Sequence, residues 1–458
     1  MKLYFRDQGD DQFDLLFDSE EEAQGYIDQY KTAVIGEGDT IVAERTEFTP
    51  QPQSSMVIID QHTGYVKALV GGRGEKTASL TLNRATDTYR QPGSTFKPLA
   101  VYGPAINDFN LTLADTYQDQ AITYESTNRP VKNAYTGYLG TMTIREAIVR
   151  SCNTIAIQCF RDITPRIGYN YLKQLGFEKV SDHIEINGKI YNDALEPTAL
   201  GGITQGVSTL ELTAAYAAIA NSGTYTKPIF YTKVLDHNGN ILLENEPETS
   251  QVFRESTAYL LTSALQSVVE DGNGTGTALR LSNMPVAGKT GTTSATRDVW
   301  FVGFTPYYTC GVWAGYDTNE YLLDDCKSFH KTLWSKVMAR IHENLPRAEF
   351  EIPANIQQAT ICAESGLLAG LGCSTRTEYF ETSTIPTVRC TQHYVPPTPE
   401  PTPEPTENPP AGENTGDGTT PDAGTTIPDN STAADPGTGT TEPAPDSGIA
   451  ASASDPGT

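Results

Sequence analysis

The sequence predicts a mixed α/β (α+β) fold with antiparallel strands, followed by a disordered C-terminal tail. Two pairs of β-rich segments, each joined by a short turn, have the pattern of antiparallel hairpins. Several segments with helical periodicity lie between and around them. The chain has 458 residues, of which 38% are hydrophobic, so it is long enough for one large or two medium domains with a buried core.

The first hairpin is predicted from the segments Ser55–Asp60 and Gly64–Gly71, which flank a polar turn. A helical segment should run from Ser94 to about Asp115. Residues 117–138 are predicted to form a polar loop, because turn-forming residues are frequent there. Further helices are predicted at Thr143–Arg150, Thr154–Asp162, Ser208–Asn221 and Ser256–Glu270.

We divide the chain into four segments. These are an N-terminal lead-in or linker at 1–50, the main domain at 51–348, a short cysteine-bearing segment at 349–393 and the tail at 394–458. The lead-in is charged and interrupted, with one helix expected through Tyr26–Ala33. The tail is predicted to be disordered, because it contains few apolar residues and no Lys or Arg balances its negative charge.

The net charge of −25 argues against a nucleic-acid-binding function. The longest apolar run, around Ala214–Ala220, is too short to cross a bilayer, and Met1–Arg6 lacks the apolar core of a signal peptide. We therefore expect that this chain itself carries neither an export signal nor a membrane anchor.

The cysteine pattern gives no sign of a zinc site. Seven cysteines are an odd number, so at least one thiol is unpaired. None of them forms the closely spaced pairs that are typical of zinc ligands, and we therefore expect no metal site. Cysteine usage leaves the redox compartment open.

The first chemical motif is Ser94 with Lys97. Pro92-Gly93 predicts a turn, and Pro98 belongs in the first turn of a helix, so a helix should begin close to Ser94. Residues i and i+3 share one helix face, which places the lysine amine beside the serine hydroxyl. A serine with a neutral lysine as its base is an activated nucleophile. The alternative is an ordinary helix cap by Ser94.

The same spacing recurs in Ser328-Phe-His-Lys331, which follows no turn signal. We interpret it as the solvated start of a later helix. The second motif is Ser151-Cys-Asn153, at a junction between two predicted helices, where a hydroxyl and a carboxamide can project together into a cleft. Ser126-Thr-Asn128 is an alternative, but it lies in the polar loop with no helix to hold it. Helix capping is the competing interpretation for both tripeptides.

The third motif is Lys289-Thr290-Gly291-Thr292, on a predicted strand from about Val286. A second hairpin, Val299–Phe304 with Thr309–Gly315, follows it. At a strand edge, a cation and hydroxyl groups can hold the carboxylate of an extended peptide that binds by strand addition. The glycine allows the ligand's backbone to come close.

Together and in this order, the three motifs resemble the signature of penicillin-binding proteins and serine β-lactamases. From about Gln51 to His393 the chain resembles the transpeptidase half of class A penicillin-binding proteins. The resemblance extends to the stretches Ile59–Gly64, Val70–Arg73, Asn83–Thr86, Gln91–Pro98, Asp298–Pro306 and Gly311–Asp317.

The resemblance implies a serine D,D-transpeptidase that forms an acyl-enzyme. Ser94 would attack the carbonyl between the two terminal D-alanines of a peptidoglycan stem peptide, and Lys97 would take its proton. Ser151 would relay a proton toward the leaving amine, while Asn153 orients Lys97 and the substrate amide. An amine of a neighbouring strand would then resolve the acyl-enzyme into a cross-link.

The resemblance also implies substrate contacts and a fold. Lys289, Thr290, Gly291 and Thr292 would form the strand that positions the terminal carboxylate, and the backbone N–H groups of Ser94 and Thr292 would form the oxyanion hole. The implied fold is a central antiparallel sheet flanked by helices on both sides, as in serine β-lactamases.

The implied partners are peptidoglycan stem peptides, as D-Ala-D-Ala donor and amine acceptor, and β-lactam antibiotics; no metal or organic cofactor is implied. The implied location is the extracytoplasmic face of the bacterial membrane or the cell wall, with membrane association in the intact protein. Class A members also carry a membrane helix and a glycosyltransferase domain, and neither is expected in residues 1–50.

Three other functions remain open at this point. A D,D-carboxypeptidase would use water in place of the acceptor amine, and a β-lactamase would rapidly hydrolyse the acyl-enzyme formed from the drug. A β-lactam-sensing or peptidoglycan-binding module would bind or become acylated without turnover. The flanking stretches weigh against the β-lactamase.

Overall fold

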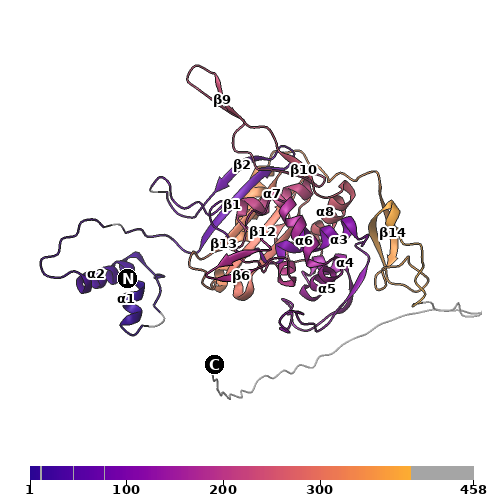
Figure 1. Cartoon of the computed structure of the whole chain (residues 1–458). Coiled ribbons are helices and arrows are strands. Elements are labelled where there is room, and N and C mark those ends of the chain that lie inside the picture. Colours follow the sequence, from indigo (N-terminus) through magenta and orange to yellow (C-terminus); the bar gives the residue numbers. More distant parts are fainter. Residues whose placement is uncertain (11–12, 45, 77, 394–458) are drawn as a thin grey trace, which may run out of the picture. The chain divides into compact units, whose positions relative to one another are not determined.

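A five-stranded antiparallel sheet forms the centre of the main domain (Figure 1). The computed structural model describes residues 1–10, 13–44, 46–76 and 78–393, so the tail predicted to be disordered lies outside the described residues. In spatial order the strands are β11 (Ala287–Thr292), β12 (Asp298–Phe304), β13 (Thr309–Gly315), β1 (Gln53–Asp60) and β2 (Tyr65–Val70). Both predicted hairpins are confirmed, and β1 joins them by pairing with β13.

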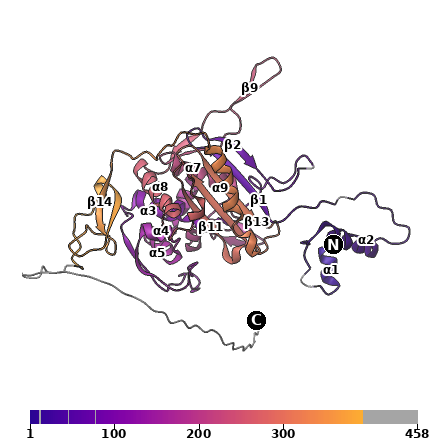
Figure 2. The ribbon, with the colours of Figure 1, turned by 180° about the vertical axis from the view of Figure 1, so that it is seen from behind.

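Helices cover both faces of this sheet. Successive residues of a strand point to opposite faces, so apolar side chains on each face pack against helices on that side. Trp300 and Val302 of β12 pack in the large apolar core with α7 (Thr209–Ala220), which lies over the sheet in Figure 1. Phe301 points the other way and meets Trp334 of α9 (Phe329–His342), with their ring centroids 5.0 Å apart. Figure 2 shows α9 over the opposite face. The predicted fold class is confirmed.

The other helices surround this core or precede it: α1 (Lys2–Asp7), α2 (Glu20–Val34), α3 (Gly103–Asp108), α4 (Ile144–Val149), α5 (Asn153–Ile163), α6 (Pro165–Gln174) and α8 (Glu255–Glu270). Five strand pairs complete the described fold: β3 (Thr116–Asp119) with β4 (Gly140–Thr143), β5 (Ile184–Ile186) with β6 (Lys189–Tyr191), β7 (Thr224–Thr226) with β10 (Thr249–Gln251), β8 (Lys233–Leu235) with β9 (Ile241–Glu244), and β14 (Ile356–Cys362) with β15 (Thr375–Glu381). Among the residues described, no helix is both long and apolar enough to span a bilayer.

The helical segment at Ser94 differs from the prediction of one continuous helix. It consists of a 3₁₀ turn, η1 (Gly93–Thr95), a π-helix, η2 (Lys97–Tyr102), and then α3, which ends at Asp108 instead of Asp115. Pro98 and Pro104 have no N–H to donate to a preceding turn, so a regular α-helical hydrogen-bond ladder cannot run through both positions. π-Helical turns of this kind are frequent at functional sites.

The lead-in also differs in detail from the single helix expected at Tyr26–Ala33. Its helix α2 begins at Glu20, because the hydroxyl of Ser19 accepts a hydrogen bond from Glu22 N at 3.1 Å. The acidic residues of the first turn further stabilise this helix start through the helix dipole.

A buried ion pair connects the cysteine-bearing segment to the main domain. Arg145 on α4 donates from Nε and Nη2 to the two carboxylate oxygens of Glu378 on β15, at 2.7 and 2.6 Å. Arg145 is 4% exposed and Glu378 is 1% exposed. The guanidinium also donates to Ser263 O and to the Ser267 hydroxyl on α8, so its remaining donors are satisfied. This pair therefore fixes β15 against α4 and α8.

We expect Glu378→Gln to lower the free energy of unfolding by about 3–5 kcal/mol, because it leaves the buried Arg145 charge without its carboxylate. Urea unfolding followed by tryptophan fluorescence measures the loss. Glu244→Gln is the matched control: its partner Lys233 is 50% exposed, so this substitution should have no measurable effect. Equal, small effects of the two substitutions would contradict a structural role for the buried pair.

Candidate active site

The stretch that carries Ser94 is fastened to β12 and β13. Arg90 Nε donates to Asp298 Oδ1 at 2.6 Å, and the same oxygen accepts from Trp313 Nε1 at 3.0 Å. Trp300 Nε1 donates to Gln91 O at 2.9 Å. Since these groups are largely buried, the hydrogen bonds hold the chain just before Ser94 in one position on the sheet.

Two glycines allow η1 to lie directly against β11. Gly93 has a φ of +57°, and a Cβ atom there would lie 2.8 Å from Thr292 O. A Cβ atom at Gly291 would lie 2.5 Å from Pro92 O. Either side chain would push the two backbones apart. The close contact brings the backbone of Ser94 beside the end of the Lys289–Thr292 strand.

Lys97 meets the second motif inside the protein. Its Nζ atom donates to the Ser151 backbone oxygen at 2.6 Å, to Ser151 Oγ at 3.2 Å and to Asn153 Oδ1 at 2.6 Å. Lys97 is fully buried. Burial disfavours the charged amine and lowers the pKa of Lys97 to about 7. Near neutral pH, a substantial fraction of Lys97 is therefore uncharged.

Lys289 reaches the same hydroxyl from β11. Its Nζ atom donates to Ser151 Oγ at 2.9 Å and to Thr290 O at 3.2 Å. Burial, then the nearby charges of Lys97 and Lys331, lower the pKa of Lys289 well below its ordinary value. Two buried amines thus share one hydroxyl, and mutual repulsion disfavours a charge on both. Such a chain of amine, hydroxyl and amine can move a proton.

Ser151 has a backbone conformation that serine rarely adopts. Its φ is +56°, in the left-handed region, which costs of order 1–3 kcal/mol for a residue with a side chain. The Cys152 N–H closes the end of α4 by donating to Ala147 O at 2.9 Å. This turn between α4 and α5 is what allows Ser151 and Asn153 to reach Lys97 together.

The polar loop before α4 holds Asn153 in place, which the sequence analysis did not anticipate. Asn133 Oδ1 accepts from Asn153 N at 2.7 Å, and Lys132 O accepts from Asn153 Nδ2 at 2.6 Å. Asp119 in turn accepts hydrogen bonds from Asn133 Nδ2 at 2.8 Å and from Thr154 Oγ1 at 2.5 Å. In the sequence, the only indication of a role for Asn133 and Asp119 was that polar residues cluster in this long loop.

Lys331 was also misjudged from the sequence. We predicted that Ser328–Lys331 begins a helix in solvent, but His330 is 2% exposed and Lys331 is partly buried. Lys331 Nζ donates to Thr275 O at 3.1 Å, and the Thr275 hydroxyl bonds to the Thr290 hydroxyl at 2.7 Å. The predicted helix start is confirmed, because Ser328 is exposed and immediately precedes α9, but the prediction that this stretch is solvated is wrong for His330 and Lys331. Lys331 lies behind the Lys289 strand and adds positive charge near it.

The structure also distinguishes between the candidate motifs. Ser126–Asn128 lies exposed in a turn, whereas Ser151 and Asn153 contact Lys97. β11 is an outer strand of the sheet, and its last residue, Thr292, is exposed.

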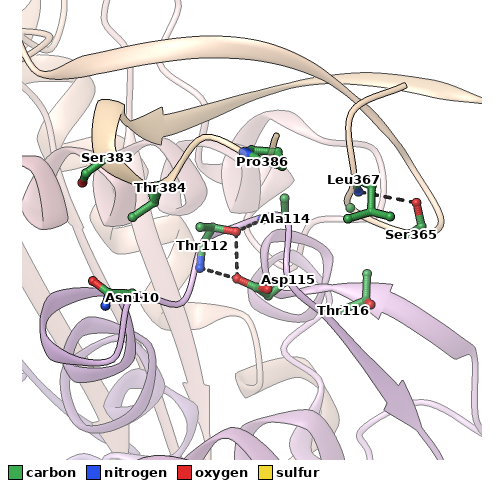
Figure 3. Close-up of a pocket in the computed structure, with 11 residues that line it drawn as sticks. Asn110, Thr112, Ala114, Asp115, Thr116, Ser365, Leu367, Ser383, Thr384 and Pro386 are labelled. Carbon is green, nitrogen blue, oxygen red and sulfur yellow. Dashed lines mark hydrogen bonds between the residues drawn. The ribbon is translucent and has the colours of Figure 1, made fainter. Parts of the chain in front are cut away.

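A pocket elsewhere lies where Asn110–Thr116 faces parts of the cysteine-bearing segment (Figure 3), and none of the predicted site residues lines it.

Two family models match this chain. Residues 54–321 match the model described as "Penicillin binding protein transpeptidase domain", and residues 352–394 match the one described as "Penicillin-binding protein 1A, C-terminal domain". Penicillin-binding protein 1A of Clostridium tetani is 37% identical over 358 residues, which are 75% of this chain and 45% of that protein. The namesake from Aquifex aeolicus is 35% identical, over 76% of this chain and 46% of its own length. The chain thus spans less than half the length of these relatives.

Solved structures resemble the fold as well. The crystal structure of penicillin-binding protein 1A from Haemophilus influenzae has a TM-score of 0.64 and 25% identity, over 74% of this chain and 55% of that one. PonA1 from Mycobacterium tuberculosis in complex with penicillin V has a TM-score of 0.58 over 72% of this chain and 85% of that one. Its identity of 23% supports likeness of fold alone.

We expect Lys97 to titrate near pH 7, charged below and neutral above that value. In protein labelled with ¹³C-lysine, the Cε resonance that disappears in Lys97→Arg should shift around this pH. Lys233 is the control, because its exposed amine bonds to Glu244, which raises its pKa above the ordinary lysine value, so its resonance should stay constant across the same range. A Lys97 resonance that titrates together with the exposed lysines would contradict the burial argument.

Proposed function

This chain belongs to the penicillin-binding protein transpeptidase family, and from that premise we propose that it is a serine-type D,D-transpeptidase that cross-links peptidoglycan stem peptides. The observation that carries the proposal is the convergence of Lys97 and Lys289 on the Ser151 hydroxyl, next to the turn that holds Ser94. This arrangement provides a base, a proton relay and a cation within one buried network, as acyl transfer through a serine requires.

In the first step, Ser94 Oγ forms a bond to the carbonyl carbon between the two terminal D-alanines. Lys97, neutral at a working pH above about 7, accepts the hydroxyl proton. The proton then passes through Ser151 Oγ to the amine of the departing D-alanine as the C–N bond breaks. Ser151 suits this role because it is hydrogen-bonded to both amines.

The developing charge on the carbonyl oxygen needs preorganised donors. We assign this role to the backbone N–H groups of Ser94 and Thr292. Support comes from the close packing of η1 on β11, since a Cβ atom at Gly93 would lie 3.1 Å from Thr292 N. A bulkier residue at that position would move the two donors apart.

The substrate's terminal carboxylate is assigned to the Lys289 strand. The peptide would align along β11, an outer strand of the sheet, with Gly291 allowing close approach. Lys289, Thr290 and Thr292 would contact the carboxylate, and Thr275 would orient the Thr290 hydroxyl. The negative substrate would also favour the protonated form of Lys289. Asn153, held by Asn133, would orient the scissile amide.

The acyl-enzyme is completed by attack of an amine from a neighbouring stem peptide, which restores the Ser94 hydroxyl and forms the cross-link. A β-lactam would acylate the same hydroxyl. We place this activity at the extracytoplasmic face of the bacterial membrane, with membrane association in the intact protein. A D,D-carboxypeptidase and a module without turnover are the remaining alternatives.

We expect a penicillin to label Ser94 alone. Digestion and mass mapping of the acylated protein should place the adduct on the peptide that contains Ser94, and Ser94→Ala should abolish labelling. Ser328→Ala, which alters the second serine with the same spacing to a lysine, should label normally. An adduct on Ser328 would overturn the assignment of the nucleophile.

The acylation rate should depend on the protonation of Lys97. It should rise with pH through about 7, because only the neutral amine accepts a proton. Lys97→Arg cannot deprotonate in this range and should lower the rate about 10²- to 10⁴-fold. Lys289→Arg keeps a cation and should retain measurable acylation. Stopped-flow acylation of both folded variants is the measurement, and a near-normal rate in Lys97→Arg would show that another group activates Ser94.

Product analysis separates the transpeptidase from its alternatives. A stem peptide ending in D-Ala-D-Ala, supplied with an acceptor amine, should give a cross-linked product and free D-alanine. A carboxypeptidase would release D-alanine without cross-linking under the same conditions. A lasting acyl adduct with no product would indicate a binding or sensing module.

A further inference from the structure

Four potential metal ligands come together at one end of the cysteine-bearing segment. Cys362 ends β14, Cys373 lies just before β15, and Cys390 and His393 follow both strands. Their ligand atoms all lie within 4.8 Å of one another. From the sequence we expected no metal site, because no two cysteines are closely spaced along the chain. That expectation overlooked the fold, which closes the separations.

The distances fit one tetrahedral ion. Nδ1 of His393 lies 3.5 Å from Cys362 Sγ, 3.6 Å from Cys373 Sγ and 3.5 Å from Cys390 Sγ. For a tetrahedral zinc ion with Zn–S of about 2.3 Å and Zn–N of about 2.0 Å, each sulfur lies about 3.5 Å from the nitrogen. Three nearly equal distances from the sulfurs to one nitrogen are expected when all four atoms surround a single ion.

The histidine is oriented as a zinc ligand would be. Its other ring nitrogen, Nε2, lies 3.0 Å from Glu364 Oε2, so the carboxylate favours a proton on Nε2 and leaves the Nδ1 lone pair free. Metal-bound histidines usually have such a carboxylate or carbonyl partner, which fixes the tautomer and the ring orientation. The Gly370 N–H also donates to Cys373 Sγ at 3.3 Å, a hydrogen bond that a thiolate would strengthen.

Backbone hydrogen bonds place the ligands without relying on an apolar core. Cys362 N donates to Leu367 O and Cys390 N donates to Leu368 O, both at 2.8 Å, so one loop joins two of the ligands. Apart from cysteines, the buried aliphatic and aromatic side chains of residues 349–393 are Ile356, Ile361 and Phe380. Ile356, Ile361 and Phe380 pack with residues of the main domain, so few apolar contacts hold the end of the segment that carries the cysteines.

From this geometry we propose that Cys362, Cys373, Cys390 and His393 form a structural zinc site with a Cys₃His ligand set. All four positions around the ion are filled by protein, so the site is closed and has no open position for catalysis. The zinc ion would hold the end of the β14–β15 hairpin to the chain that follows it. It would act together with the Arg145–Glu378 pair, which anchors the middle of β15 to the main domain.

A disulfide is the competing explanation for neighbouring cysteines. A disulfide between any two of the three would leave the third sulfur and His393 without a role. It would also bring two of the sulfurs to about 2 Å from each other, so the three sulfurs would no longer lie at similar distances from His393 Nδ1. The Glu364 contact holds the His393 ring with Nδ1 toward the three sulfurs, as metal ligation requires.

The test uses the full chain, purified without chelators and freed of loosely bound metal by gel filtration. Elemental analysis should find about one zinc ion per chain. Cys373→Ser should lose nearly all of it, whereas Cys326→Ser, which alters a cysteine outside the cluster, should retain it. Glu364→Gln should still bind zinc but about 10- to 100-fold more weakly in a chelator competition.

Two measurements on the wild-type protein test the zinc site without depending on how well Cys373→Ser folds. Cobalt added to metal-free wild-type protein should give thiolate-to-cobalt charge-transfer bands and the visible bands of a tetrahedral ion. After denaturation in a chelator without reductant, all seven cysteines should react with iodoacetamide. Two fewer reactive thiols in the wild-type protein, or zinc content equal in wild type and Cys373→Ser, would overturn the proposal.

Discussion

The burial of two lysine amines around one serine hydroxyl constrains all three segments that form the candidate active site. Lys97 and Lys289 are both fully buried, and a buried ammonium group is costly unless it is paired or loses its proton. Within the described part of the chain, neither amine donates a hydrogen bond to a carboxylate; both instead donate to Ser151. Burial therefore favours a neutral Lys97, which is the state in which this amine can accept the proton of the serine hydroxyl.

Three separate parts of the chain must meet for this network to exist, and each is held by polar contacts of its own. The turn before Lys97 is fixed on the sheet by Arg90 and Asp298. The α4–α5 junction is held by Asn133, and it includes a strained residue, Ser151. β11 is placed by its pairing with β12. The strain at Ser151 persists because α4, α5 and the two lysines together determine its position.

The cysteine-bearing segment is stabilised by a different kind of interaction. Its two strands bury few apolar side chains, so hydrophobic burial contributes less there than in the sheet and its covering helices. The buried Arg145–Glu378 pair at one place, and the cluster of cysteines and His393 at another, compensate for that. Both use residues that are far apart in the sequence.

The sequence alone determined the local elements and the chemistry of the three motifs. Hairpins and most helices follow from periodicity, turns and caps, which depend on neighbouring residues. Only the tertiary structure decided between Ser151–Asn153 and Ser126–Asn128, showed that Lys331 lies behind Lys289, and brought Cys362 near His393. The same holds for η2, where two prolines interrupt the expected helix. These features depend on contacts between residues far apart in the chain. The energies of such contacts cannot be inferred from the residues next to each position in the sequence.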